Sequence, residues 1–139
     1  RYLRKISRPL LDRIDICVEV PPIGFKDLYN TGKSERSEEI RKRVIRTQEI
    51  QKMRYCGEEF CFNSHIPSSK IFEYCKLDKK QETYMERMYN KLDLTARTYH
   101  KILRVARTLA DMEESEQIKM RHLNEAICYR NIDKKFWEV

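Results

Sequence analysis

The chain has 139 residues, of which 40% are hydrophobic and 37% charged, with only 3 Gly and 4 Pro. This length favours one domain, and the composition indicates helices with solvated faces rather than a disordered chain. The 29 Lys and Arg outnumber the 22 Asp and Glu, and the resulting net charge of +7 suits a polyanion, although interspersed charge of both signs also serves solubility. No apolar run of membrane length and no signal peptide is present, so no membrane partner is expected.

The cysteine pattern indicates the cellular compartment of the protein and whether a metal site is expected. Five cysteines form an odd set without a Cys-x-x-Cys pair, which is typical of reduced thiols and predicts a cytoplasmic location. Cys56, Cys61 and His65 lie near one another in the sequence, but their spacing is irregular and a fourth ligand is missing. The sequence therefore predicts no metal site.

The first predicted element is a β-strand in the stretch RPLLDRIDICVEV, residues 8–20. Apolar and polar residues alternate strictly over residues 14–20, which indicates a strand with one buried face. The apolar positions are Ile14, Ile16, Val18 and Val20. No other segment predicts a strand, and a single strand cannot satisfy its own backbone groups. We therefore expect the partner strands of this segment to lie outside the chain.

Helices are predicted for most of the remaining residues. Pro21 and Pro22 end the strand, and residues 23–36 predict a linker loop. Periodicity and caps then predict helices at about residues 37–55, 69–75, 79–91, 95–113 and 121–131. In the first of these, Ile40, Val44, Gln51 and Tyr55 are expected to face inward. The fold class is therefore mainly α: a bundle of four to five helices preceded by one orphan β-strand.

The long helix after Thr95 carries a basic stripe opposite an apolar one. At roughly 100° per residue, Lys101 and Arg104 fall within about 40° of Arg97. Leu103, Ala106 and Ala110 cluster on the opposite side with Tyr99. By periodicity alone the basic stripe predicts a solvated face, with nucleic-acid contact as the alternative.

Arg97 differs from the rest of the stripe because it lies in the first helical turn. The helix dipole disfavours a cation there unless an anion binds at the same place. The position of Arg97 therefore hints at a phosphate ligand.

Two motifs carry a resemblance to a known family. KISRPLLDRIDICVEV together with LTARTYHKILRVARTLADMEESEQIKMRHLNEAICYR resembles the C-terminal part of the magnesium-chelatase-related AAA+ ATPases, in their competence-protein branch. A weaker likeness extends to the minichromosome-maintenance helicases. The resemblance covers nearly the whole chain and implies three parts: the end of the AAA+ core (1–22), a linker loop (23–36) and a helical lid-type domain (37–139).

The resemblance also implies roles for two arginines. Arg13 matches the arginine finger, which would reach ATP bound to the neighbouring subunit of a ring and is worth about 10³–10⁵ in rate in phosphoryl transfer. Arg97 matches sensor 2, which would contact the ATP phosphates from the lid. The chain departs from the family pattern in having Arg8 after Ser7, and in having Cys17 where the family usually carries histidine.

A GxxxxGK[ST] phosphate loop, a Walker B strand and sensor 1 are all missing from the chain. We therefore expect a C-terminal piece that does not hydrolyse ATP by itself and binds no cofactor alone. Its full-length parent would bind ATP and Mg²⁺, pair this piece with the rest of the AAA+ core, form a hexameric ring and remodel DNA as a helicase or branch-migration motor. The alternatives are a free-standing basic nucleic-acid-binding module, with Lys101 and Arg104 as weak contact candidates, and a helical interaction domain without a ligand.

Overall fold

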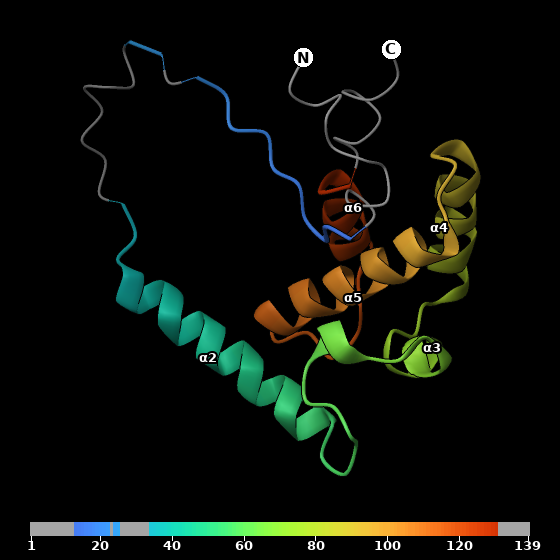
Figure 1. Cartoon of the computed structure of the whole chain (residues 1–139), viewed down its shortest axis with the longest axis horizontal. Helices are drawn as coiled ribbons and strands as arrows, with labels where there is room; N and C mark the ends of the chain where they lie inside the picture. The colour runs from blue at the N-terminus through green and yellow to red at the C-terminus, as the bar shows by residue number, and fades with distance from the viewer. Residues whose placement is uncertain (1–12, 23, 26–33, 131–139) are drawn as a thin grey trace.

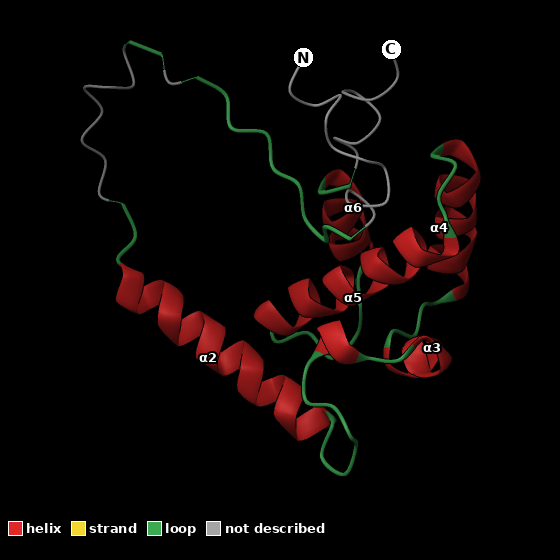
Figure 2. Ribbon diagram, in the orientation of Figure 1, coloured by secondary structure: helices red, strands yellow, loops and turns green. Residues whose placement is uncertain are grey.

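The described part of the chain is helical. The structure, a computed structural model, describes residues 13–22, 24–25 and 34–130, which contain five α-helices and no β-strand (Figures 1 and 2). The helices are α2 (Ser37–Arg54), α3 (Ile71–Tyr74), α4 (Lys79–Lys91), α5 (Ala96–Met112) and α6 (Met120–Cys128); two short 3₁₀ helices, η3 (Asn63–His65) and η4 (Ser68–Lys70), precede α3. The prediction of a mainly α chain with four to five helices is confirmed.

Helix α5 forms the centre of the fold. Figure 1 shows it running through the middle of the molecule, with α6 above it, α2 below it and α4 at one end. Its predicted apolar stripe is buried, because Leu103, Ala106 and Ala110 are each 0% exposed. Leu123 of α6 and Met85 of α4 are also fully buried in the same core. Burial of one continuous apolar stripe therefore places α5 among its neighbours.

Side-chain caps determine where α4 and α5 begin. The Asp78 carboxylate accepts a hydrogen bond from the backbone N–H of Gln81 at 2.9 Å, and the Gln81 side chain accepts one from the Asp78 N–H at 2.9 Å. At α5 the Thr95 hydroxyl accepts the N–H of Thr98 at 3.2 Å. These caps satisfy N–H groups that have no partner within the helix. They explain why both starts agree with the prediction.

The buried face of α2 differs from the predicted one. Gln51 and Tyr55 are buried as expected, but Ile40 and Val44 are 44% and 47% exposed. Thr47 is buried in their place, at 8% exposure. Only the C-terminal half of α2 packs against α5 and η3, where Gln51 accepts the backbone N–H of Asn63 at 3.1 Å. Periodicity located the correct face of α2, but it could not indicate how far along the helix the packing extends.

The predicted strand is wrong for the described residues. Residues 14–20 have no strand assignment, and Ile16, Val18 and Val20 are 48%, 66% and 83% exposed. The segment contacts the end of α6, where the Cys17 N–H donates to the Tyr129 carbonyl at 2.9 Å. A β-ladder needs a neighbouring strand, and the described residues contain none. Residues 1–12 of the predicted core segment lie outside the described residues, as do residues 23 and 26–33 of the linker and residues 131–139 of the predicted lid-type domain.

Cys75 should differ from the other cysteines in reactivity. It is 1% exposed, and burial raises the pKa of its thiol to about 12, whereas Cys56, Cys61 and Cys128 are exposed. Because only the thiolate reacts, we expect a maleimide at pH 8 to label the exposed three quickly and Cys75 only on unfolding. Peptide mapping by mass spectrometry would check this, and rapid labelling of native Cys75 would contradict the packing.

Candidate functional site

The first turn of α5 presents an unpaired cation at a helix N-terminus. Arg97 is the second residue of α5, is exposed, and makes no side-chain hydrogen bond or ion pair with the described residues. Helix α5 has no acidic residue in its first turn, whereas α2 carries Glu38 and Glu39 there. The positive end of the α5 dipole therefore has no acidic side chain to balance it, and a guanidinium adds to that positive charge. This arrangement can bind an anionic group.

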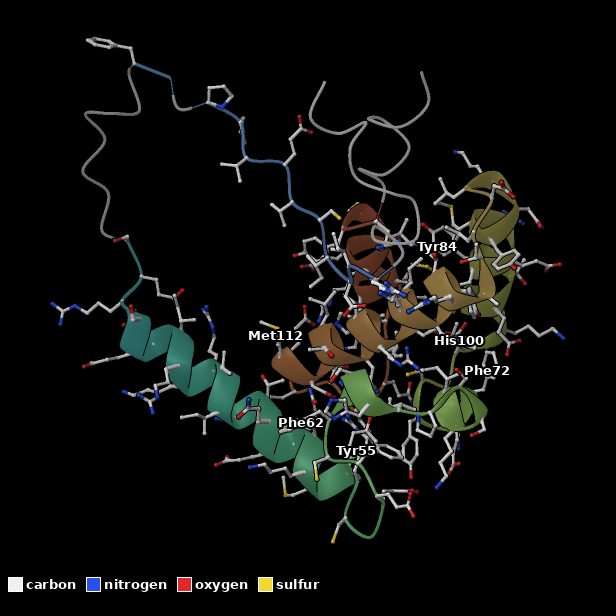
Figure 3. All side chains as sticks on the ribbon, viewed as in Figure 1. Tyr55, Phe62, Phe72, Tyr84, His100 and Met112 are labelled. Atoms are coloured by element: carbon white, nitrogen blue, oxygen red, sulfur yellow. The ribbon has the colours of Figure 1, made fainter. Side chains whose placement is uncertain are left out.

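Aromatic rings border this turn. Phe72 of α3 is 61% exposed, and its ring lies edge-on to His100, with centroids 5.8 Å apart (Figure 3). Tyr99 contacts Tyr89 of α4 in the same T-shaped manner at 5.9 Å. Burial lowers the pKa of His100, and the charge of Arg104 lowers it further. The ring of His100 is therefore a neutral, half-buried neighbour one turn from Arg97.

Arg13 lies at the start of the segment that contacts α5. Its side chain is exposed and makes no hydrogen bond or ion pair with the described residues. The two residues after it are held in place: Lys101 pairs with Asp15 at 2.7 Å and donates to the Ile14 carbonyl at 3.3 Å. The Ile14 carbonyl also accepts a hydrogen bond from Arg130. Residues 14–15, which follow Arg13, therefore contact α5 at Lys101, one turn beyond Arg97. Arg13 and Arg97 themselves do not contact each other.

The basic stripe of α5 is not a solvated face. Lys101 is only 8% exposed, and Arg104 is partly buried and donates to the Ile66 carbonyl at 2.7 Å. Of the three stripe residues, Arg97 alone remains exposed and unpaired among the described residues. The solvated-face interpretation is therefore wrong for Lys101 and Arg104, because η3, the following loop and the N-terminal segment cover them. Their role as nucleic-acid contacts stays a prediction.

Comparison with known proteins identifies the family of the chain. Residues 34–130 match the family described as magnesium chelatase, subunit ChlI C-terminal. The chain belongs to this family.

Individual relatives show which part of a longer protein the chain corresponds to. The competence protein ComM of Haemophilus influenzae is 42% identical over 131 residues, which is 94% of this chain and 25% of ComM. The uncharacterized protein YifB of Salmonella typhimurium is 37% identical, and that of Escherichia coli 35%, each over 96% of this chain and 26% of YifB. The chain therefore spans about a quarter of the length of these relatives and is homologous to their C-terminal region.

A buried ionic network, which the sequence analysis missed, holds this ChlI-type C-terminal domain together. The Asp111 side chain is 0% exposed and accepts two hydrogen bonds from Arg54, one of them at 2.8 Å. Arg107 donates to the same carboxylate at 3.1 Å, and the Asn63 amide donates at 2.8 Å. Charge and hydrogen bonding from Asp111 outweigh the effect of burial and raise the pKa of Arg54, whereas burial lowers the pKa of Arg107. One carboxylate thus connects α2, η3 and α5.

Arg107 extends the network to the loop before α6. It donates to the carbonyls of Glu116 at 2.8 Å and Ser115 at 2.6 Å. The Arg107–Asp111 pair has i,i+4 spacing on the long helix, which was the one signal in the sequence that could have revealed the network. In the described residues no group of three or more His, Cys, Asp or Glu is arranged to hold a metal ion, and no helix is both long and apolar enough to cross a membrane.

Proposed function

We propose that this domain is the helical lid of a magnesium-chelatase-like ATPase and that Arg97 contacts the phosphates of bound ATP as sensor 2. The observation that carries the proposal is the exposed Arg97 guanidinium in the first turn of α5, which has no partner among the described residues and lies where the helix dipole also favours an anion. Arg97 would report the nucleotide state by drawing α5 toward the γ-phosphate. Because α5 packs against the core of the domain, such a shift would move the domain as a unit.

Arg13 is proposed to act on a different nucleotide, as an arginine finger in trans. A guanidinium stabilises the negative charge that develops on the transferred phosphoryl group. The contacts of Asp15 and Ile14 with Lys101 support this proposal, because they connect the backbone next to Arg13 to α5. In a ring of subunits, this connection would couple the finger that serves one nucleotide to the lid that covers another.

The longer protein is proposed to bind ATP and Mg²⁺, to form a homo-oligomeric ring and to remodel DNA. Its phosphate loop and magnesium ligands would come from sequence that is homologous to the remaining three-quarters of the relatives. The similarity to a competence protein supports work on DNA, and the net charge of +7 suits a polyanion. This lid would contribute arginines to the ATP site without performing hydrolysis by itself.

Replacing Arg97 tests the sensor role. In the longer protein, Arg97→Ala is expected to lower ATP turnover at least about tenfold, because a donor to the phosphates is lost. Turnover would be measured with a coupled phosphate-release assay. In the 139-residue chain the same substitution should change the free energy of unfolding by less than about 0.5 kcal/mol, because the side chain is exposed and has no partner among the described residues.

Arg87→Ala is the matched control, because Arg87 is an exposed arginine on α4. It should leave turnover unchanged. Near-normal turnover in Arg97→Ala, or an equal loss in Arg87→Ala, would reject the assignment of Arg97.

A further inference from the structure

A stripe of side chains follows one face of α2 from end to end, but only half of it is packed. Ile40, Val44, Thr47 and Gln51 are spaced by four, three and four residues, which places them on one side of a helix. Thr47 and Gln51 are buried in the half of α2 that packs against α5, and Gln51 also accepts the backbone N–H of Asn63 in η3. Ile40 and Val44, two turns before them, are about half exposed.

The end of α5 explains where the packing stops. Arg46 of α2 pairs with Glu114, just beyond the last turn of α5, at 2.6 Å. The two helices therefore separate at this point, and the turns of α2 before Arg46 extend past the domain (Figure 1). Met112, the last residue of α5, is also 50% exposed. We call Ile40 and Val44 the open stripe.

Basic side chains flank the open stripe on α2. Arg36 and Arg43 lie on one side of Ile40 and Val44, and Arg41 lies on the other. Arg43 pairs with Glu35 at 2.7 Å, while Arg36 and Arg41 make no ion pair with the described residues. A second copy of the chain would place the same cations against each other, which is unfavourable. The flanks therefore select an acidic partner over self-association.

We propose that the open stripe is a docking surface for an amphipathic α-helix of a partner protein, with acidic residues on both sides of its apolar face. The partner helix would continue the helix–helix packing that α5 provides for the other half of α2. Its carboxylates would face Arg36 and Arg41, so that charge determines which helix binds and apolar burial supplies affinity. This surface is separate from Arg97 and Arg13, and the proposal does not depend on ATP hydrolysis.

Two synthetic peptides test the surface. Both form a helix with leucines at i, i+3, i+4 and i+7; one carries glutamates beside the leucines and the other carries lysines. Titrated into the 139-residue chain and followed by fluorescence anisotropy, the glutamate peptide is expected to bind at about 10–100 µM and to weaken with added salt. The lysine peptide should bind at least about tenfold more weakly because of like-charge repulsion.

The chain offers a matched control for the apolar contact. The double substitution Ile40→Ser and Val44→Ser should weaken binding of the glutamate peptide by at least about tenfold, because it removes two anchoring side chains. Ile45→Ser should weaken peptide binding by less than about twofold, because Ile45 points away from the open stripe. Ile45 is a matched control, since Ile45 and Ile40 are each 44% exposed. All these positions are exposed, so circular dichroism should show unchanged folding.

Three results would overturn the proposal. The first is no binding of the glutamate peptide at millimolar concentration, and the second is an equal loss from Ile45→Ser. The third is a dimer in sedimentation equilibrium that Ile40→Ser with Val44→Ser dissolves, since it would identify a second copy as the occupant.

Discussion

Asp111→Ala is expected to destabilise this domain by about 3–5 kcal/mol, a large fraction of the stability of a domain of this size. Among the described residues, the substitution removes the only anion of a buried cluster that includes the guanidinium groups of Arg54 and Arg107. Arg54 is partly exposed and can turn toward water, but the Arg107 side chain is 5% exposed and would keep its charge in the interior. An unpaired buried charge is costly because the protein solvates it poorly.

Urea unfolding followed by circular dichroism would measure the loss. Glu114→Ala is the matched control. Glu114 is an acidic residue near the same end of α5, and both side chains of its ion pair with Arg46 are exposed. It should cost less than about 1 kcal/mol. If Asp111→Ala does not fold at all, Asp111→Asn keeps the shape, removes the charge and should still be clearly less stable than the Glu114 variant. A free energy of unfolding within 1 kcal/mol of the parent chain for Asp111→Ala would show that the network contributes little.

Arg13→Ala should give the largest effect on activity. In the longer protein we expect ATP turnover to fall at least about tenfold, and by as much as about 10³–10⁵ if the guanidinium is a full arginine finger. ATP binding should persist, because the finger acts on the transition state at a neighbouring subunit. The free energy of unfolding of the 139-residue chain should not change, since Arg13 is exposed and unpaired among the described residues.

Mixed rings distinguish action in trans from action in cis. Subunits with Arg13→Ala, mixed with subunits that cannot bind ATP, should regain part of the turnover, because some interfaces then join an intact finger to an intact nucleotide site. Activity that stays absent in every mixture, with rings shown to assemble, would contradict action in trans. Turnover near that of the unaltered protein in pure Arg13→Ala rings would remove Arg13 from the ATP site altogether.

The helix starts and the apolar stripe of α5 follow from local sequence. Helix starts depend on residues within one turn, and Asp78 and Thr95 make the capping contacts that their positions predict. The apolar stripe of α5 depends only on helical period, so Leu103, Ala106 and Ala110 could be assigned to the core without knowledge of their neighbours. The resemblance to the family also rests on short motifs, and the match of residues 34–130 to the family confirms it.

Tertiary structure alone decided which of the remaining side chains are buried. Lys101 belongs to a stripe that looks solvated by period, yet it is covered because Asp15, far away in the sequence, packs beside it. Ile40 and Val44 have the pattern of a core face but stay exposed because α5 ends near Arg46. The alternating segment 14–20 forms no ladder, since a strand requires a neighbour that the described chain does not supply. Periodicity determines which face a residue occupies, whereas burial depends on whether another element reaches that face, and this is a property of contacts distant in sequence.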